Sequence, residues 1–311
     1  MELPSGEQVA KIFESVRNWG RWGPDDEIGA LNHLGPAQRA RAATLVTEGF
    51  SVGLGLPLPV RPSPEVTFPA QHHMIAAGDA CGSCGLPPGY QASSDYIGTN
   101  VHDFGVTHVD ALCHTFKDDL MWNGRPTTDV LSTGAVRNDI GKVCDLLAGR
   151  GVLLDIPRVR GVHYLEPDTA IRIADLEAAE QTQSVRVERG DLLLIATGRD
   201  RRRRALPNGI NLRVDGTPGL HPECALWFHE REIAVLGGDG VSDMTPAGRI
   251  ADWPYPIHQC CIVSTGIHLI DNMCLEPAQD ACAARGRWEF LLTVNPIRIP
   301  CATGCPVNPV A

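Results

Sequence analysis

Three short apolar runs constrain the fold more than any other feature of this 311-residue chain. They are GVLLDI at 151–156, DLLLIAT at 191–197 and IAVLGGD at 233–239, and their length and composition are typical of buried strands. Helical patterns lie between them, IRIADLEAAEQT at 171–182 and PECALWFHERE at 222–232. Such an alternation of strands and helices predicts an α/β fold.

The sequence on both sides of this alternating part follows other patterns. Residues 53–100 are rich in Pro and Gly and predict loops with short strands, and residues 284–299 predict a late strand. A barrel or mixed sheet is therefore expected rather than a simple doubly wound sheet. The first fifty residues predict two helices, in PSGEQVAKIFESVRN and GPAQRARAATLVTEG. No linker divides the chain, so we expect one domain over 1–311 with an N-terminal helical and loop arm at about 1–60.

The charge balance argues against nucleic acid as a partner. The chain has 27 Lys and Arg against 37 Asp and Glu, a net charge of -10, whereas proteins that neutralise many phosphates are usually basic. The one basic run, RDRRRR at 199–204, is interpreted as a solvated loop.

No apolar run approaches the ~18 residues of a membrane span, so no membrane partner is expected. The first twenty residues lack the apolar core of a secretory signal, which predicts a cytoplasmic protein.

The 11 cysteines are expected to be reduced. Most occur in apolar contexts such as CDLLAG and HQCCIV, where a free Cys behaves as a small hydrophobe. Cys81 and Cys84 form a CxxC in a Gly-rich stretch, and Cys301 and Cys305 lie in CATGC; we interpret both pairs as unpaired loop thiols.

No G-x-G-x-x-G follows a strand, and P-loop and G-x-S-x-G motifs are absent, so neither a nucleotide cofactor nor serine-hydrolase chemistry is predicted.

The sequence THVDALCH at 107–114 carries the strongest chemical signal. His108 and Asp110 are two residues apart, so their side chains would project side by side from an extended strand. An imidazole nitrogen and a carboxylate oxygen together suit zinc, manganese or iron. His114 follows after ALC and could reach the same pocket from a turn, as a general acid or base. The alternative is that all three are polar side chains satisfied by hydrogen bonds within a sheet.

A mononuclear metal site needs at least a third ligand, and the segment PIHQCCIVSTGIHLIDN at 256–272 offers candidates. Its His258 opens one apolar stretch, and its Asp271 ends the next one. A helix that leads into a strand would bring the two side chains together. Taken separately, His258 is a histidine at a helix end and Asp271 an aspartate in a turn, so both interpretations stay open.

The combined motifs resemble those of the cyclase-like metal-dependent hydrolases, a family that includes bacterial kynurenine formamidase and isatin hydrolase. THVDALCH is similar to the histidine–aspartate–histidine signature of the family. NWGRWGPDDEIGALN at 18–32 is similar to the opening of its longer bacterial members. GDLLLIATGR at 190, PGLHPECALWFHEREIAVLGGDGVSD at 218 and HLIDN at 268 occur in the expected order. The resemblance covers most of the chain.

The resemblance implies a mixed β-barrel-like core wrapped by helices, of the swivelling β/β/α type, in a homodimer or homotetramer. It also implies a centre of one or two divalent metal ions, zinc or manganese, that activates water. By position, His108 and Asp110 become metal ligands, with Asp110 able to bridge two ions, and His258 matches the later histidine ligand. Asp271 stands where a ligating glutamate is usual, and His114 matches the histidine that moves the proton.

The chain departs from the family pattern at several positions. Formamidases of the family usually have a histidine four residues before the one matched by His108, where this chain has Phe104. His102 is two residues further back, on the same face of an extended segment, and could substitute as a ligand. The usual glycine and proline of the motif are here Val106 and Leu112. These differences leave the number of metal ions and the formamidase activity open.

These inferences predict a metal-dependent hydrolase of a small cyclic or acyl amide, in which His114 carries the proton. Aromatic and imidazole side chains would suit a flat small-molecule substrate. The candidate pocket residues are Trp19, Trp22, His72, His73 and Phe104. A second hypothesis keeps the fold and assigns a metal-dependent cyclase or dehydratase of secondary metabolism. A third, favoured by the residue at position 104, is a metal-free binding protein.

Overall fold

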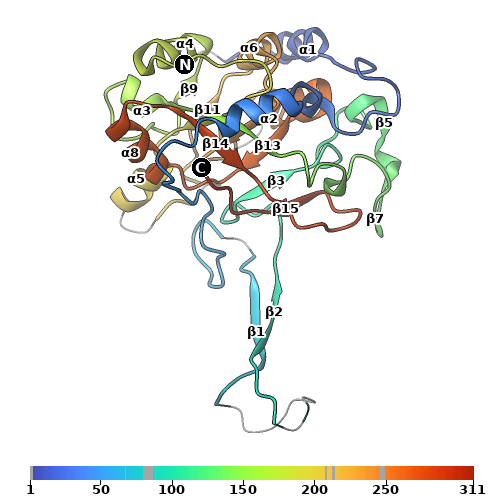
Figure 1. Cartoon of the computed structure of the whole chain (residues 1–311). Helices are drawn as coiled ribbons and strands as arrows, with labels where there is room; N and C mark the ends of the chain where they lie inside the picture. Colours follow the sequence, from blue (N-terminus) through green and yellow to red (C-terminus); the bar gives the residue numbers. More distant parts are fainter. Residues whose placement is uncertain are drawn as a thin grey trace.

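The computed structural model describes residues 3–66, 68–79, 87, 89–206, 209–211, 214–245 and 249–311. Its centre is a seven-stranded mixed sheet in the order β14-β8-β10-β12-β13-β3-β15 (Figure 1). The pairs among β8, β10, β12 and β13 are parallel, whereas β14–β8, β13–β3 and β3–β15 are antiparallel. The strands span Glu289–Thr293 (β14), Ala148–Asp155 (β8), Leu192–Ala196 (β10), Val235–Gly238 (β12), His268–Asp271 (β13), His108–Asp110 (β3) and Gly304–Pro306 (β15).

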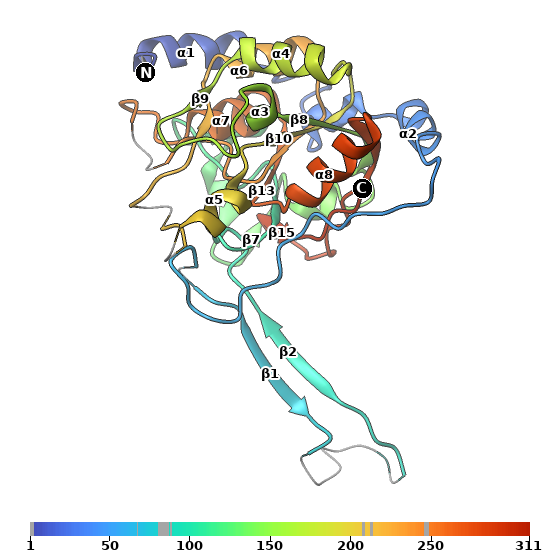
Figure 2. The same ribbon diagram turned by 90° about the vertical axis from the view of Figure 1, so that its left-hand side faces the viewer.

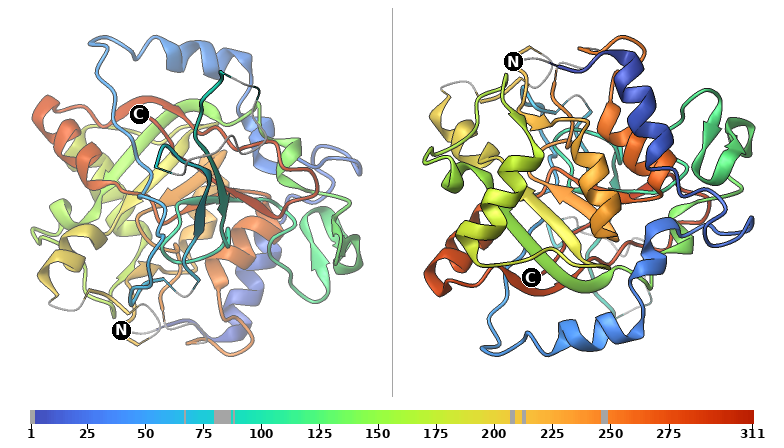
Figure 3. Two further views of the ribbon diagram at one scale, coloured as in Figure 1. Left: turned by 90° about the horizontal axis from the view of Figure 1, so that it is seen from below. Right: turned by 90° about the horizontal axis from the view of Figure 1, so that it is seen from above.

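Helices and buried segments cover both faces of this sheet, so β10 and β12 are buried along their whole length. On one face, Leu193 and Ile195 of β10 belong to a cluster with side chains of α4 and α6. These two helices lie over the near face of the sheet in the right-hand view of Figure 3. On the other face, Leu192 and Leu194 belong to a cluster with side chains of α8. The main helices span Gly6–Ser15 (α1), Pro36–Ala43 (α2), Ile173–Gln183 (α4), Arg199–Ala205 (α5), Cys224–Arg231 (α6) and Glu276–Arg285 (α8).

The predicted α/β alternation is confirmed. The three apolar runs form β8, β10 and β12, and the helical patterns between them form α4 and α6. The late strand is β14, and the two N-terminal helices are α1 and α2. Helix α2 ends at Ala43, earlier than the pattern predicts. The hydroxyl of Thr44 donates a hydrogen bond to the carbonyl oxygen of Arg41 at 2.7 Å, a local bond that competes with continuation of a helix.

The core is an open mixed sheet across the described residues rather than a closed barrel, with β14 and β15 at its edges. The C-terminal segment nevertheless links these two edges. After β15 has paired with β3, Val310 forms an isolated antiparallel bridge with Thr293 of β14. Val52 and Ala311 exchange both backbone hydrogen bonds, at 2.8 and 2.9 Å. The sheet therefore resembles the barrel that the resemblance implied only through these isolated bridges between its edges. The organisation of the chain as a single domain stays a prediction.

A long hairpin projects from the body of the molecule (Figures 1 and 2). It consists of β1 (Gln71–Ala76) and β2 (Ser94–Gly98), paired antiparallel, and we call it the hairpin arm. Its strands confirm the short strands expected within residues 53–100. Ile75 of β1 and Ile97 of β2 are 61% and 59% exposed, so apolar side chains of the arm face solvent in the isolated chain.

The basic run at 199–204 is a helix, so the interpretation as a solvated loop was wrong. It forms α5, and two of its members, Arg199 and Arg202, are buried. The carboxylate of Asp239, directly after β12, accepts backbone hydrogen bonds from residues 197–199 and so fixes the start of the helix. The remaining arginines of the run, Arg201, Arg203 and Arg204, form ion pairs with acidic side chains, and of these three Arg204 stays exposed.

The cysteines that the structure describes are free, as expected. They include Cys301, which is exposed, and Cys305, which is buried in β15, so the expectation that Cys305 lies in a loop was wrong. The other close pair, Cys81 and Cys84, lies outside the described residues. Across the described part of the chain, no helix combines the length and the apolar character that crossing a membrane requires.

Candidate metal centre

Two neighbouring strands, β3 and β13, bring three of the predicted ligands together. Their antiparallel register pairs Asp271 with His108. Asp110 lies two residues further along β3, and Nε2 of His108 is 3.4 Å from its Oδ1. The other ring nitrogen of His108, Nδ1, lies 2.8 Å from the carbonyl oxygen of Val106. Since a carbonyl oxygen only accepts, Nδ1 carries the proton and Nε2 is left to face the carboxylate.

His258 joins this group from a helical segment. It ends α7 (Pro256–His258) and is followed by a π-helical segment, η5 (Gln259–Thr265), that leads into β13. Nε2 of His258 lies 3.3 Å from Oδ2 of Asp271 and 3.6 Å from Oδ2 of Asp110. The prediction that a helix leading into a strand brings His258 and Asp271 together is therefore confirmed.

Asp243, a residue to which no local sequence pattern assigns a role, orients His258. Its Oδ2 lies 2.7 Å from Nδ1 of His258 and accepts the hydrogen bond. The same carboxylate accepts the backbone N–H groups of Ile257, at 2.7 Å, and of His258, at 3.1 Å. A carboxylate on the far nitrogen of a histidine is a frequent partner of metal-binding imidazoles. The only sequence signal for Asp243 was its position at the end of the family-like segment 218–243.

Residues 101–106 form turns and bends, so the extended segment expected to carry both His102 and His108 is limited to residues 108–110. The side chain and the carbonyl group of Asp103 both accept backbone hydrogen bonds from within this turn. His102 reaches the site from the turn rather than from a shared strand face. Its Nδ1 lies 2.9 Å from Oδ1 of Asp110, and its Nε2 lies 3.0 Å from Oγ1 of Thr303.

The assembled side chains fit a divalent metal ion. The ligand atoms of His102, His108 and Asp110 all lie within 4.8 Å of one another, and so do those of Asp110, His258 and Asp271. Asp110 belongs to both groups and is fully buried, and its Oδ2 has no hydrogen-bond partner among the residues that the structure describes. A buried carboxylate oxygen without a partner costs free energy, which a cation would remove. Imidazole nitrogen and carboxylate oxygen are donors that suit zinc and manganese.

The electrostatics of the cluster also favour positive charge at its centre. Burial raises the pKa of Asp110, but the surrounding imidazoles lower it well below its ordinary value. Burial lowers the pKa of His258, but the hydrogen bonds to Asp243 and Asp271 raise it well above its ordinary value. The pKa of His108 is raised by Asp110 in the same way, against the effect of burial. A carboxylate that stays ionised inside a buried site attracts a cation.

His114 lies beside the ligand groups but belongs to neither of the two sets found among the described residues. It ends a turn after β3, in which its backbone N–H donates to the carbonyl oxygen of Ala111. Its ring stacks on that of His102 with the centroids 3.6 Å apart, and its Nε2 lies 3.9 Å from Oδ1 of Asp110. Burial and the nearby His102 and His258 lower its pKa to about 4, despite Asp110. Its imidazole is therefore neutral at pH 7 and able to accept a proton.

A cavity of about 410 Å³ opens onto these side chains. Its polar lining includes His102, His108, His114, His258 and Asp271. Its apolar and aromatic lining includes Phe104, Phe116, Val241, Pro254 and Tyr255. Aromatic walls beside a small group of polar side chains suit a small molecule that contains a ring. Of the five candidate pocket residues from the sequence, Phe104 is thus found at this cavity.

The other four candidate pocket residues do not line this cavity of the single chain. Trp19 donates its indole N–H to a backbone carbonyl of η5 at 2.7 Å, and Trp22 packs edge-on against His33 at a centroid distance of 5.1 Å. Both indoles therefore serve in packing, which the large apolar area of a tryptophan favours. His72 and His73 lie on the hairpin arm, where His72 contacts a carboxylate of β2 at 2.9 Å.

The fold and the cluster together define a class of α/β protein, in which the central sheet presents His and Asp side chains that fit a divalent metal. Residues 52–243 match the family described as "Putative cyclase". This match spans more than half of the chain, so the protein belongs to that family. The resemblance inferred from the motifs is confirmed.

Solved structures show the same relationship. A structure described as a novel cyclase is 31% identical, with a TM-score of 0.86 over 96% of this chain and 98% of its own. Isatin hydrolase A from Labrenzia aggregata is 20% identical, with a TM-score of 0.62 over 87% of this chain and 97% of its own. A "predicted metal-dependent hydrolase" from Bacillus stearothermophilus is 16% identical, with a TM-score of 0.51 over 84% and 97%. The latter two share the fold of this chain. None of the curated proteins matches it.

Proposed function

We propose that this protein is a metal-dependent hydrolase of a small cyclic or acyl amide. The observation that carries the proposal is the Asp110 carboxylate, shared between two ligand groups beside a cavity that His114 also lines. The cavity, at about 410 Å³, matches a small molecule. Structures of the same fold include isatin hydrolases, whose name indicates a cyclic amide as substrate, and this supports the same substrate class here.

In this proposal His108, Asp110, His258 and Asp271 hold the metal, zinc or manganese, and His102 adds a further donor. Oδ1 of Asp110 lies near His102 and His108, whereas its Oδ2 lies near His258, so the carboxylate has one oxygen for each ligand group. A metal bound there would polarise the substrate carbonyl and lower the pKa of water.

His114 is the proposed acid–base residue. As neutral imidazole it accepts the proton that the attacking water loses when the water oxygen bonds to the carbonyl carbon. It then donates this proton to the leaving nitrogen as the C–N bond breaks, so that a carboxylic acid and an amine are formed, and the acid releases its remaining proton to solvent at neutral pH. The stacking of His114 on His102 supports this role, because it holds the ring beside the ligands. Phe104 on the cavity wall would pack against the ring of the substrate.

A cyclase or dehydratase is the second candidate function for the same site. The family description and the 31% identical structure described as a novel cyclase favour it. A polarised carbonyl can also undergo ring closure or loss of water, with His114 as the base. Hydrolysis adds water across the C–N bond of an amide, whereas condensation to a ring or dehydration of a hydroxy acid releases water. Turnover of amides, compared with turnover of hydroxy acids that contain no amide, therefore distinguishes the two functions.

Metal analysis of protein purified without a chelator tests the proposal. We expect about one equivalent of zinc or manganese per chain. Asp110→Ala should lose the metal, because it removes the carboxylate that both ligand groups share. Asp145→Ala is a matched control, since that carboxylate is exposed and outside the cavity. Equal metal in the Asp110 variant and the wild type would contradict the ligand assignment, and a metal-free wild type would favour the binding-protein hypothesis.

Activity is then measured on the metal-loaded protein with isatin as the cyclic amide and an N-formyl arylamine as the acyl amide. Hydrolysis of either compound, lost in Asp110→Ala, is the expected result. Full metal content with no turnover of the two amides, together with net ring closure or dehydration of a hydroxy acid, would favour the second candidate function instead.

We also propose that the protein forms a homodimer or homotetramer, as the resemblance implied. The exposed apolar side chains of the hairpin arm support this, because a two-stranded hairpin is at best marginally stable alone in water. Sedimentation velocity of the wild type and of an Ile75→Lys, Ile97→Lys variant tests it. We expect the wild type to sediment as an oligomer and the double variant to dissociate more readily. A monomeric wild type would contradict the proposal.

A further inference from the structure

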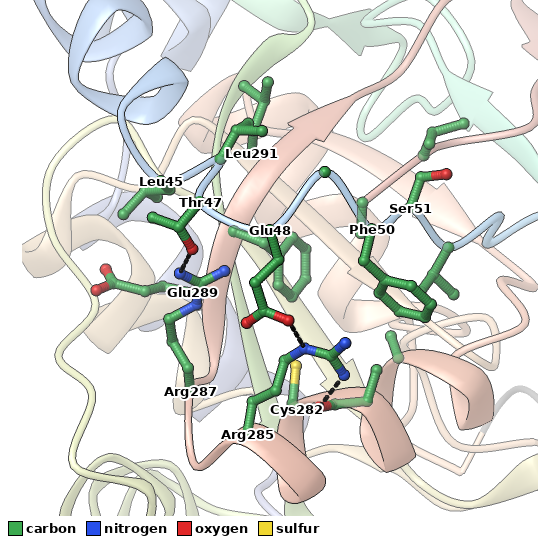
Figure 4. A pocket seen from close by; sticks show the side chains of 18 of the residues that line it. Leu45, Thr47, Glu48, Phe50, Ser51, Cys282, Arg285, Arg287, Glu289 and Leu291 are labelled. Carbon is green, nitrogen blue, oxygen red and sulfur yellow. Dashed lines mark hydrogen bonds and ion pairs between the residues drawn. The ribbon is translucent and has the colours of Figure 1, made fainter.

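A second cavity, of about 270 Å³, is formed by other elements (Figure 4). Its walls come from the segment 45–52 after α2, from α8 and from β14, and it shares no lining residue with the cavity at the metal centre. Most of its lining is apolar. The main apolar side chains are those of Leu45, Phe50, Cys282, Phe290 and Leu291.

Two carboxylates and two guanidinium groups also line this cavity, and three of these four charges are already paired. Oε2 of Glu48 accepts from Nε of Arg285 at 3.0 Å. The guanidinium of Arg285 also lies over the ring of Phe50, 4.5 Å from its centroid. Oε2 of Glu289 accepts from Nε of Arg150, which lies outside the cavity lining, at 2.6 Å.

Arg287 carries the fourth charge, and no carboxylate of the described structure forms an ion pair with it within 4.0 Å. Its polar contact is a hydrogen bond from Nη1 to Oγ1 of Thr47 at 2.9 Å, which is visible in Figure 4. One bond to a neutral hydroxyl leaves most of the five guanidinium donors available. Burial raises the pKa of the Cys282 thiol in the cavity wall to about 11. The positive charges of Arg287 and Arg285 oppose this rise in pKa, which places both charges near the apolar wall.

We propose that this cavity binds a small monocarboxylate with an aromatic or branched apolar body, and that Arg287 pairs with the carboxylate. A guanidinium group presents two parallel donors that match the two oxygens of a carboxylate. The apolar body would lie against Phe290 and Leu291, where it removes apolar surface from water. A monocarboxylate fits better than a neutral molecule or a dianion, because one positive charge in the cavity, that of Arg287, has no carboxylate partner among the described residues.

Benzoate is the probe, and benzyl alcohol is its uncharged counterpart. Binding is measured by calorimetry and by methyl NMR on metal-free protein, so that benzoate cannot bind a metal. We expect benzoate to shift the methyl signals of Leu45 and Leu291, which line this cavity, and not those of Val241, which lines the other. Arg287→Met should weaken benzoate binding by roughly 10- to 100-fold, the effect of losing a charged hydrogen-bond partner, and should leave the alcohol unaffected.

Two further variants separate this proposal from indirect effects. Arg298→Met removes an exposed guanidinium outside the cavity and should bind benzoate like the wild type. Ala281→Phe narrows the cavity from α8 and should abolish benzoate binding, with folding checked by circular dichroism. Equal benzoate affinity in Arg287→Met and wild type, shifts confined to Val241, or a second copy of the chain that covers Leu45 and Leu291 in solution would each overturn the proposal.

Discussion

Nδ1 of His258 lies 2.7 Å from Oδ2 of Asp243, and this contact directs Nε2 of the same ring toward Asp271 and Asp110. A carboxylate on Nδ1 fixes the tautomer of an imidazole and makes its other nitrogen a better electron-pair donor. Asp243 also holds the backbone at residues 257 and 258, so one side chain sets both the position and the orientation of a proposed ligand.

Asp243→Asn should therefore weaken metal binding by about 10- to 100-fold while the fold is retained. Asparagine keeps the size of the side chain but loses the charge that acts on Nδ1. The affinity is measured by competition with a chromogenic chelator. Asp139→Asn is a suitable control, because Asp139 also accepts a backbone N–H at the start of a helical segment but does not line the cavity. Equal affinities for wild type and Asp243→Asn would show that the contact is purely structural.

His102 should act as a ligand in place of the histidine that is missing at position 104. Its Nδ1 is 2.9 Å from Oδ1 of Asp110, and its ligand atom lies within 4.8 Å of those of His108 and Asp110. We expect His102→Ala to lower the metal content below the wild-type value of about one equivalent per chain, measured by elemental analysis. Thr303→Val, which removes only the partner of its Nε2, should have a smaller effect. A metal-bound structure with two occupied ions and His102 away from both would contradict this role.

The fold could be predicted from the sequence where periodicity and burial agree. The runs that form β8, β10 and β12 are buried on both faces, and such strands are recognisable from apolar character alone. The basic run of α5 was misread because charge indicates exposure, whereas here a single acidic residue, Asp239, fixes the start of the helix beside it. Contacts of that kind join residues about forty positions apart and leave no local pattern.

The site could be predicted in part for a similar reason. His108 and Asp110 follow from the two-residue spacing of a strand, and the approach of His258 to Asp271 follows from a helix that leads into a strand. His102 was a candidate because an extended segment would place its side chain on the same face as that of His108. The structure has a turn at Asp103 instead, and His102 reaches the site from that turn. Asp243 was not found, because its role is a tertiary contact with a residue fifteen positions away.

The stability of the fold should fall on mild acidification, partly through His33. Burial lowers the pKa of His33 to about 4, and its Nδ1 has no hydrogen-bond partner in the described part of the chain. Between the unfolded pKa of ~6.5 and the folded value, the unfolded chain binds a proton that the folded chain does not, so stability is lost as the pH falls through this window.

His33→Phe keeps a ring beside Trp22 and removes the titration. Urea unfolding of metal-free protein at pH 7 and pH 5 should show a loss of stability about 2 kcal/mol smaller in this variant than in the wild type. His163→Phe, at an exposed histidine, should lose as much as the wild type. An identical loss in His33→Phe would mean that His33 is protonated in the folded chain at pH 5.

His114→Ala should keep its metal and lose most of its turnover. The side chain lies 3.9 Å from Asp110 and stacks on His102, but it belongs to neither ligand set among the described residues. A general acid or base contributes typically ~10²–10⁴-fold to a rate, whereas loss of a ligand removes the metal itself. A base is active when deprotonated, so the wild-type rate should rise with pH through the pKa of His114. Burial lowers that pKa, so the rate should rise at a pH below ~6.5, the ordinary pKa of an imidazole.

The variant should lack this limb, and metal content and pH–rate profile are measured on the same preparation. An inactive His114→Ala protein that is also metal-free would make His114 a ligand. A metal-loaded variant whose activity and acidic limb match the wild type would transfer the proton-carrying role to another group.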